Sequence, residues 1–356
     1  MKKKCLFYIH NFLESHHYAI MSFLDYMNDY ADFTICAKAF YENHLSLYNK
    51  FSNKIFLNNL TVYEDFWRSF DIVHIIFDGL PSLGIAAIAK TYDIPYIISF
   101  HGGHDTNSKI YNPEIRIKLP EIINFSKRTT VVCNKDKNKL CKLQCSKRRI
   151  EIIPPTIDEK ILDSDINPEI NKNITLVGRL IPKKGIDIAI KALKYLSEDY
   201  KLYIIGDGKE KNSLQNLATE LKLDCRIFWL GELPLEKTIE ILKKNFILWH
   251  PARKDNKGNA EGIPQIILYA MALGKYIITT NTGSINSVIK NKKNGIFFKV
   301  EDPKSLAKNT LKYDNYKYDK IRFSAQNDSK HFYAHTQHNT WKKLYNCGSD
   351  IKWLFL

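Results

Sequence analysis

The stretch ITLVGRLIPKKGIDIAIKALKYL, residues 174–196, shows in one piece the unit that sets the fold of this chain. Residues 174–177 are mostly apolar and rich in β-branched side chains, which predicts a short buried strand. After a loop with a glycine at each end, the apolar residues of 186–196 recur with the period of an amphipathic helix. A strand that leads directly into a helix is typical of parallel βαβ units.

The same alternation continues through both halves of the 356-residue chain. In the first half it predicts helices over 81–90 and 113–125, and strands over 5–9, 33–37, 71–77, 96–100, 129–133 and 150–153. In the second half it predicts helices over 186–196, 210–221, 235–243 and 263–273, and strands over 174–177, 202–205, 227–230, 247–250, 276–279 and 296–300. Two such runs predict an α/β protein with two Rossmann-like domains, in which ligands bind beyond the carboxyl ends of the strands.

Two prolines separate the halves. Pro154 and Pro155 fix the backbone and cannot continue a strand ladder. The polar segment that follows has the composition of a linker. We therefore predict a first domain over 1–158, a linker over 159–172 and a second domain over 173–334.

The composition is that of a globular protein with a basic surplus. Hydrophobic residues make up 44% of the chain, charged residues 26%, and the net charge is +15. Basic residues within 135–142 and 147–149 favour contact with an anionic membrane surface, and an ordinary solvated surface is the alternative. No zinc-finger spacing and no ribonucleoprotein-type aromatic motif accompanies the charge, so we expect no nucleic-acid partner.

The start of the chain does not have the pattern of a secretory signal. The first apolar run covers only residues 5–9, whereas such a signal needs roughly 7–15 apolar residues. No run approaches the roughly 18–20 residues that cross a bilayer. We expect a cytoplasmic protein with peripheral contact to the inner face of the cytoplasmic membrane, and the seven scattered cysteines fit thiols in a reducing compartment.

Two cations follow the strand at 174–177. Arg179 and Lys184 lie between the carboxyl end of a strand and the N-terminus of a helix, a position that favours anions. Arginine can form paired hydrogen bonds to phosphate oxygens, and lysine acts as a point charge. The pair suits a leaving diphosphate, on which charge builds as a glycosidic bond breaks. An ordinary basic loop is the alternative.

Glu261 precedes another predicted helix. Gly262 allows a ligand to approach the backbone closely, and Pro264 is typical of the start of a helix. A carboxylate beside unpaired backbone N–H groups can accept hydrogen bonds from a sugar diol. The alternative is an acidic residue that only stabilises the helix dipole.

His101 begins the run HGGHD at 101–105, directly after a predicted strand. An imidazole at this strand end can bind a hydroxyl group or assist proton transfer. His104 and Asp105 add two possible metal ligands, but three ligands within five residues around two glycines make a weak metal site. A tight Gly-Gly turn is the alternative.

Taken together, these residues resemble the retaining glycosyltransferases of family 4, which have the GT-B fold of two Rossmann-like domains facing each other across a cleft. Around 255–264 the sequence is similar to bacterial enzymes that build exopolysaccharide or lipopolysaccharide. The landmarks follow in the family's order: DIVH at 71–74, HG at 101–102 with Asp105, IPPTID at 153–158, VGR at 177–179, KG at 184–185, IGDG at 205–208, EGIP at 261–264 and AMALG at 270–274.

The resemblance implies roles for these residues. Arg179 and Lys184 would bind the donor diphosphate, Glu261 would contact the donor sugar, and His101 would face the reacting sugar. No metal ion or other cofactor is implied, and the acceptor hydroxyl would attack from the front, assisted by the departing phosphate. The last helix, about 335–356, would pack back on the first domain. The implied donor-binding residues are Gly178, Gly262, Ile263, Pro264 and Tyr269.

The chain departs from the family in three places. Tyr269 stands where the family has a second acidic residue that holds the ribose, and a phenol cannot clamp a diol as a carboxylate does. Gly283-Ser284 and Ser287 replace a usual Gly-Gly and Glu. Residues 11–15, NFLES, replace a glycine-rich loop. These departures bear on donor affinity and donor identity.

The resemblance predicts a retaining hexosyltransferase. It would move a sugar from a nucleotide-diphospho-sugar, a UDP-sugar, to a glycan acceptor that is lipid-linked or belongs to a lipopolysaccharide or exopolysaccharide. The alternatives on the same architecture are a sugar-nucleotide epimerase, a phosphorylase and a non-catalytic relative that binds sugar-nucleotides.

Overall fold

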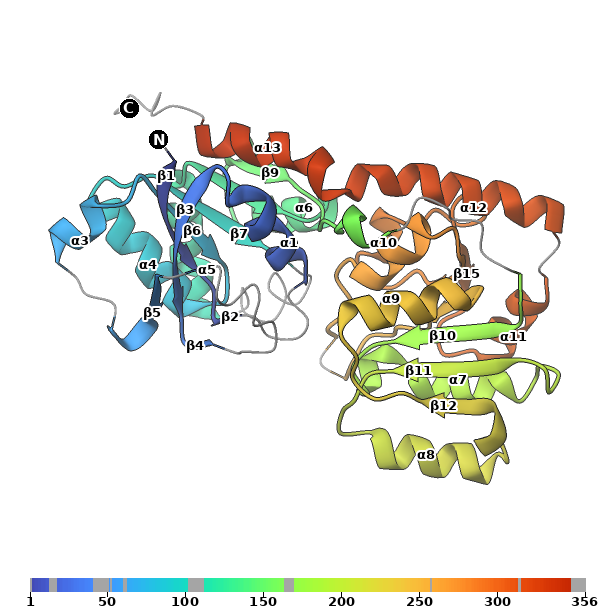
Figure 1. Ribbon diagram of the computed structural model, residues 1–356. Coiled ribbons are helices and arrows are strands. Elements are labelled where there is room, and N and C mark those ends of the chain that lie inside the picture. The colour runs from blue at the N-terminus through green and yellow to red at the C-terminus, as the bar shows by residue number, and fades with distance from the viewer. Residues whose placement is uncertain are drawn as a thin grey trace. The chain divides into compact units, whose positions relative to one another are not determined.

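A computed structural model describes residues 2–12, 18–40, 51, 53–59, 63–101, 112–162, 170–256, 258–312 and 315–346 (Figure 1). Contacts within the chain divide it into two compact units. Unit 1 comprises Met1–Thr156 and Ala334–Leu356, and unit 2 comprises Ile157–Tyr333. Each unit has its own parallel sheet and its own hydrophobic core.

The sheet of unit 1 is parallel, with the strand order β5-β3-β1-β6-β7-β8-β9. Its central strands β6 and β7 are buried at every position, as expected for strands covered on both faces. The sequence does not predict β5, a short edge strand whose partly exposed residues form no apolar run. The bounds are Lys3–Tyr8 (β1), Ala31–Ala37 (β3), Lys54–Phe56 (β5), Ile72–Ile76 (β6), Tyr96–Phe100 (β7), Arg128–Val131 (β8) and Ile150–Ile152 (β9), with a separate pair Asn11–Phe12 (β2) and Ala39–Phe40 (β4).

Helices of unit 1 follow their local start signals. The helix predicted over 113–125 is confirmed, because Asn112 caps it by accepting a hydrogen bond from the backbone N–H of Glu114 and Pro113 opens the first turn. The helices are Tyr18–Met27 (α1), Glu64–Arg68 (α3), Leu80–Thr91 (α4), Pro113–Phe125 (α5), Asn134–Lys142 (α6) and, much later in the chain, Ala334–Asn346 (α13).

α13 belongs to unit 1 through its apolar face. Trp341, Leu344 and Tyr345 are buried in one cluster with residues of β1 and α1. The Trp341 ring lies 4.7 Å from that of Phe23, centroid to centroid. Lys127 Nζ also donates a hydrogen bond of 3.0 Å to the Tyr345 carbonyl oxygen. A segment near the C-terminus therefore completes the core of the N-terminal sheet.

The sheet of unit 2 is also parallel, in the order β12-β11-β10-β13-β14-β15. Every one of these strands was predicted, with ends shifted by two residues or fewer. The strands are Asn173–Val177 (β10), Lys201–Ile205 (β11), Ile227–Trp229 (β12), Ile247–His250 (β13), Tyr276–Thr280 (β14) and Ile296–Phe298 (β15). The helices are Ile186–Leu193 (α7), Lys211–Glu220 (α8), Leu235–Lys244 (α9), Gln265–Ala272 (α10), Pro303–Leu311 (α11) and Asn315–Ser329 (α12).

No helix in the described part of the chain has both the length and the apolar character of a membrane span.

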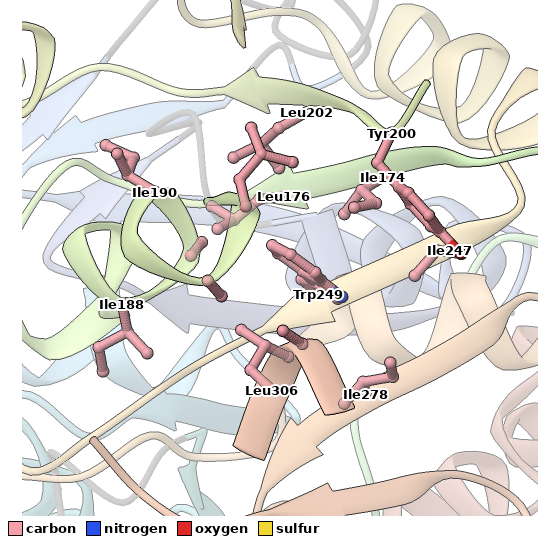
Figure 2. Close-up of a cluster of buried hydrophobic side chains, with 14 of the residues drawn as sticks. Ile174, Leu176, Ile188, Ile190, Tyr200, Leu202, Ile247, Trp249, Ile278 and Leu306 are labelled. Carbon is pink, nitrogen blue, oxygen red and sulfur yellow. The ribbon is translucent and has the colours of Figure 1, made fainter. Parts of the chain in front are cut away.

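The core of unit 2 lies between its sheet and the helices α7 and α11. Figure 2 shows Leu176 and Trp249 of the sheet beside Ile190 of α7 and Leu306 of α11, all in one buried cluster. Trp249 Nε1 donates a hydrogen bond of 3.0 Å to Thr310 Oγ1, so the buried indole N–H is paired. Because successive strand residues point to opposite faces, the next residue, His250, points away from this core.

α10 begins two residues later than predicted. Pro264 is not in the first turn but at the N-cap, with extended backbone at φ −71° and ψ 122°. The residue before a proline is disfavoured in the helical conformation, which keeps Ile263 out of the helix as well. Glu261 to Pro264 therefore lie outside the helix, in the segment between β13 and α10.

Candidate functional site

Two loops meet at one edge of the sheet in unit 2. β10 and β13 pair directly and run parallel, so their carboxyl ends lie side by side. β10 leads into the 3₁₀ turn Pro182–Lys184 (η5), and β13 leads into the segment that ends at Glu261. This edge is where parallel α/β sheets bind ligands.

Lys184 and Glu261 form a direct ion pair at this edge. Lys184 Nζ donates a hydrogen bond of 2.8 Å to Glu261 Oε2. Lys183 Nζ lies 3.1 Å from Glu261 Oε1, close enough to pair electrostatically but not aligned as a hydrogen bond. The structure thus brings two predicted residues together. It adds Lys183, which in sequence has no feature that sets it apart from its lysine neighbour.

Arg253 holds the turn that carries the two lysines. Its Nε donates a hydrogen bond of 2.8 Å to the Pro182 carbonyl oxygen, and its backbone N–H donates one of 2.9 Å to the Lys183 carbonyl oxygen. Its guanidinium also lies 3.1 Å from Asp187 at the start of α7. The lysine turn is therefore anchored to the segment after β13, independently of the ammonium groups.

Glycines allow the close packing around the pair. Gly283 has φ +65°, and a β-carbon there would come within 1.9 Å of the Glu261 carbonyl oxygen. Ser284 N–H donates a hydrogen bond of 3.0 Å to that same oxygen, so this turn fixes the backbone of Glu261. At Gly178 a β-carbon would lie 3.1 Å from Lys184 Cδ, so the glycine leaves room for the lysine stem.

The electrostatics favour an ionised Glu261. Its burial, at 7% exposure, would by itself raise the pKa of the carboxyl group. The positive charges of Lys184 and Lys183 outweigh burial and hold the pKa of this carboxyl group well below its ordinary value. Two ammonium groups against one carboxylate leave a net positive charge, which attracts an anionic ligand.

His250, the last residue of β13, lies beside this cluster and is 2% exposed. Burial, together with the positive charges of Lys184 and Lys183, lowers the pKa of the imidazole to about 3, against a smaller opposite effect of Glu261. The ring is therefore neutral at physiological pH. Its Nε2 is buried and has no hydrogen-bond partner among the described residues, and the same holds for Glu261 Oε1.

Two unpartnered polar atoms at one charged cluster indicate a place for a ligand, because buried polar groups in folded proteins are almost always paired. His250 is a candidate that the sequence prediction missed. The sequence does contain a signal for His250, because a histidine ends an otherwise apolar strand at the sheet edge where ligands bind.

The other predicted donor residues lie in the loop after β10, in the segment after Glu261 and in α10. Arg179 is exposed in the loop after β10, and Gly262, Ile263 and Pro264 continue from Glu261 toward α10. Tyr269 is buried within α10, at 1% exposure. Its hydroxyl oxygen accepts a hydrogen bond of 3.1 Å from the backbone N–H of Asp158.

His101 belongs to unit 1. It follows β7 directly and is partly buried. Residues 102–105, which include His104 and Asp105, lie outside the described residues. Within the described part of the chain, no group of three His, Cys, Asp or Glu side chains is arranged to hold a metal ion.

Family comparisons match two successive parts of the chain. The model described as "Glycosyltransferase Family 4" matches residues 34–160, and the model described as "Glycosyl transferases group 1" matches residues 158–317. The two models together leave only the ends of the chain unmatched. The two halves found by the sequence analysis thus each correspond to a glycosyltransferase module.

Curated relatives are about a quarter identical to this chain over the aligned residues. An uncharacterized glycosyltransferase of Methanocaldococcus jannaschii is 27% identical over 255 residues, which are 69% of this chain and 66% of the relative. The Escherichia coli UDP-Gal:alpha-D-GlcNAc-diphosphoundecaprenol alpha-1,3-galactosyltransferase is 27% identical over 259 residues, 66% of this chain and 64% of that enzyme. The chain therefore spans just under two thirds of the length of these relatives.

Solved structures share the fold over nearly the whole chain. Anabaena HepE, crystallised in complex with UDP, has a TM-score of 0.80 at 15% identity and covers 96% of this chain and 99% of its own. A glycosyltransferase from Rickettsia africae has a TM-score of 0.79 at 18% identity, over 97% of this chain and 98% of its own. The predicted GT-B class is confirmed, and with the two successive module matches the chain belongs to the family 4 glycosyltransferases.

Proposed function

We propose that this protein transfers a sugar from a nucleotide-diphospho-sugar, a UDP-sugar, to a lipid-linked, lipopolysaccharide or exopolysaccharide acceptor, with retention of anomeric configuration. The observation that carries the proposal is the cluster of the partly buried Lys183 and Lys184 with the buried Glu261 at the carboxyl edge of the sheet in unit 2. A net positive, water-poor cluster at this edge suits a diphosphate whose charge increases as the sugar leaves.

Each residue of the cluster has a role in this proposal. Lys184 uses one of its three N–H donors on Glu261 and keeps two for phosphate oxygens. Arg179, exposed in the same loop, adds a planar donor for the diphosphate. Glu261 Oε1 and His250 Nε2, which have no hydrogen-bond partner in the described structure, accept hydrogen bonds from hydroxyl groups of the donor sugar. The donor lies beside Glu261 along Gly262, Ile263 and Pro264. Tyr269, buried in α10, holds the backbone of Asp158 through its hydroxyl oxygen.

The relatives support the choice of donor and acceptor class. The E. coli relative is named for UDP-galactose as donor and a diphosphoundecaprenol-linked sugar as acceptor. Two other relatives are named for the synthesis of teichuronic acid and of amylovoran. HepE was crystallised with UDP-glucose. We therefore propose that unit 2 binds the donor and that unit 1, with His101 at its strand edge, binds the acceptor.

A donor screen tests the proposal. The full chain is incubated with UDP-, GDP- and ADP-sugars, with and without short polyprenyl-diphosphate-linked acceptors, and nucleotide release and glycosylated product are followed by mass spectrometry. We expect release and product with a UDP-sugar. We expect Glu261→Gln to abolish both while the matched surface variant Glu240→Gln, at an exposed position of α9, leaves them unchanged.

The alternatives give different results in the same screen. A change of the nucleotide-sugar itself without an acceptor indicates an epimerase, and phosphate-dependent cleavage of an oligosaccharide indicates a phosphorylase. Binding of UDP in calorimetry without turnover of any donor indicates a non-catalytic relative. We consider this alternative because Tyr269 stands where the family has an acidic residue. Any of these outcomes would contradict the transferase proposal.

We also propose a cytoplasmic location with peripheral contact to the membrane through the basic surface of α6 and the turn after it. Lys135, Lys142, Lys147 and Arg148 are exposed there. Opposite charge attracts such a surface to anionic lipid, and salt weakens the attraction. Co-flotation with phosphatidylglycerol vesicles at low salt, and its loss at high salt, is the expected result. Equal flotation with neutral vesicles would contradict it.

A further inference from the structure

A second polar cluster lies in unit 1, at the carboxyl ends of the adjacent strands β1 and β6 (Figure 1). Tyr8 is the last residue of β1 and pairs in register with Ile75 of β6. His10 follows two residues after Tyr8, and Asp78 follows two residues after the end of β6. The cluster thus occupies the edge at which parallel sheets bind ligands.

A buried carboxylate is the centre of this cluster. Asp78 Oδ2 accepts a hydrogen bond of 2.6 Å from the Tyr8 hydroxyl, and Oδ1 accepts one of 2.5 Å from the Ser82 hydroxyl. The Asp78 side chain is 8% exposed. Burial, the charge of Asp78 and the hydrogen bond raise the pKa of Tyr8 well above its ordinary value, so the phenol stays protonated as a donor. The carboxylate is therefore held in one orientation by two protein hydroxyls.

His10 is the accessible member. Its Nδ1 is buried and lies 2.7 Å from Asp78 Oδ2, in electrostatic contact although not aligned as a hydrogen bond. A carboxylate at Nδ1 favours the tautomer that carries its proton there, which leaves a lone pair on Nε2. The side chain is 41% exposed, and no hydrogen bond of the described residues involves Nε2.

The arrangement differs from that of a histidine with a purely structural role. His74, in the same sheet, is fully buried and uses both ring nitrogens in hydrogen bonds within unit 1. His10 instead turns one nitrogen toward a fixed acid and leaves the other accessible. In the tautomer with its proton on Nδ1, Nε2 is an acceptor for a hydroxyl group.

We propose that His10 Nε2 binds a hydroxyl group of the acceptor glycan and that Asp78 is the positioning residue that sets the tautomer and orientation of the ring. This inference rests on the proposed function, because the hydroxyl is assigned to the acceptor of the transfer. It adds a specific acceptor contact on unit 1, separate from His101 and from the donor cluster of unit 2.

Two amide variants of His10 test which ring nitrogen binds the acceptor. Asparagine places a polar atom near the position of Nδ1, and glutamine places one near the position of Nε2. Initial rates are measured with UDP-galactose, UDP-glucose and UDP-N-acetylglucosamine as donors. The acceptors are glucose and N-acetylglucosamine linked by diphosphate to a short polyprenyl chain. The donor release rate without acceptor is recorded for each variant.

The proposal expects His10→Ala and His10→Asn to raise the acceptor KM about tenfold, the loss of one hydrogen bond, and His10→Gln to restore it to within about threefold. The donor KM and acceptor-independent release stay unchanged. Asp78→Asn raises the acceptor KM by a smaller factor, because it alters only the orientation of the ring. His335→Ala, at an exposed histidine of α13, is the matched control and changes neither KM.

Two outcomes overturn the inference. One is an unchanged acceptor KM in His10→Ala. The other is rescue by asparagine instead of glutamine, which would indicate that His10 only pairs with Asp78. Failure of the proposed function looks different, since the unaltered protein would then turn over none of the UDP-sugars with any acceptor.

Discussion

His74 and His250 are both buried histidines on parallel strands, one in each unit, and they differ in what surrounds them. His74 Nδ1 lies 2.7 Å from the Tyr345 hydroxyl and Nε2 lies 2.7 Å from Ser99 Oγ. Thr130 Oγ1 then donates a hydrogen bond to Ser99 Oγ. His250 Nε2 has no hydrogen-bond partner in the described part of the chain, and its neighbours are two lysines and a glutamate.

The difference separates a polar cluster that serves the fold from one that serves function. Around His74 hydroxyl groups meet both ring nitrogens, and the network ties α13 to the sheet of unit 1. Around His250 charge is concentrated and buried acceptors are left over, which costs stability without a ligand.

The largest effect is expected at the charged cluster. Lys184→Ala removes the ammonium group that pairs with Glu261 and, in our proposal, with the donor diphosphate. Loss of one such charge-stabilising donor lowers kcat by roughly 100- to 1,000-fold. Steady-state transfer measures the change, and Lys191→Ala on α7, which is mostly exposed, is the control. Undiminished transfer by Lys184→Ala would remove the cluster from the mechanism.

The next effect contrasts the two histidines directly. His74→Phe removes two buried hydrogen bonds, to the hydroxyls of Tyr345 and Ser99, which we expect to lower the free energy of unfolding by about 2–4 kcal/mol. His250→Phe breaks no hydrogen bond, so we expect a loss of less than about 1 kcal/mol together with weaker donor binding. Urea unfolding and UDP calorimetry on both variants measure these changes. Equal destabilisation would contradict the distinction.

An effect of comparable size is expected in the pH dependence of stability. Burial lowers the pKa of His250 to about 3, whereas an unfolded histidine titrates near about 6.5. Below that pH the unfolded chain binds a proton that the folded chain does not, so stability falls as the pH is lowered. Each such histidine contributes a slope of about 1.4 kcal/mol per pH unit between the two values. Urea unfolding between pH 6.5 and 4 should show a shallower slope in His250→Phe, and an unchanged slope would contradict the assignment.

The smallest effect is expected away from both clusters. Lys118 and Glu114 form an ion pair of 2.9 Å on α5, but both side chains are about half exposed. Water screens such a pair, so Lys118→Ala should change the free energy of unfolding by less than about 0.5 kcal/mol. Thermal unfolding beside His74→Phe measures the contrast. A loss as large as that of His74→Phe would show that pairing alone, rather than burial, decides the cost.

The sequence predicted the central strands because their signal is local. Residues 96–100 and 247–250 are short runs in which all but one or two residues are apolar, and the structure has strands with these same bounds. The edge strand β5 was missed because it is only partly buried and carries no such run. The start of α10 was misplaced because Pro264 acts at the N-cap, a choice that depends on the conformation of Ile263.

For the candidate site, the sequence identified Lys184 and Glu261 but not the residues that surround them. Lys183 and His250 lie beside this pair because β10 and β13 are neighbours in the sheet. These two strands are far apart in the chain. Gly283 belongs to the site because its turn packs on the Glu261 carbonyl group. Such contacts leave no periodic pattern in the sequence.

By itself, then, the amino-acid sequence determined the α/β alternation, the two parallel sheets and the order of the motifs at the strand ends. These follow from short continuous apolar runs in the strands and from apolar residues that recur with period 3.6 in the helices, signals that lie in the residues of each short segment. Only the tertiary structure decided which strand ends adjoin, and hence which charges meet and which buried atoms lack a partner. The physical reason is that Coulomb interactions and hydrogen bonds depend on distance in space, and strand order sets that distance independently of separation along the chain.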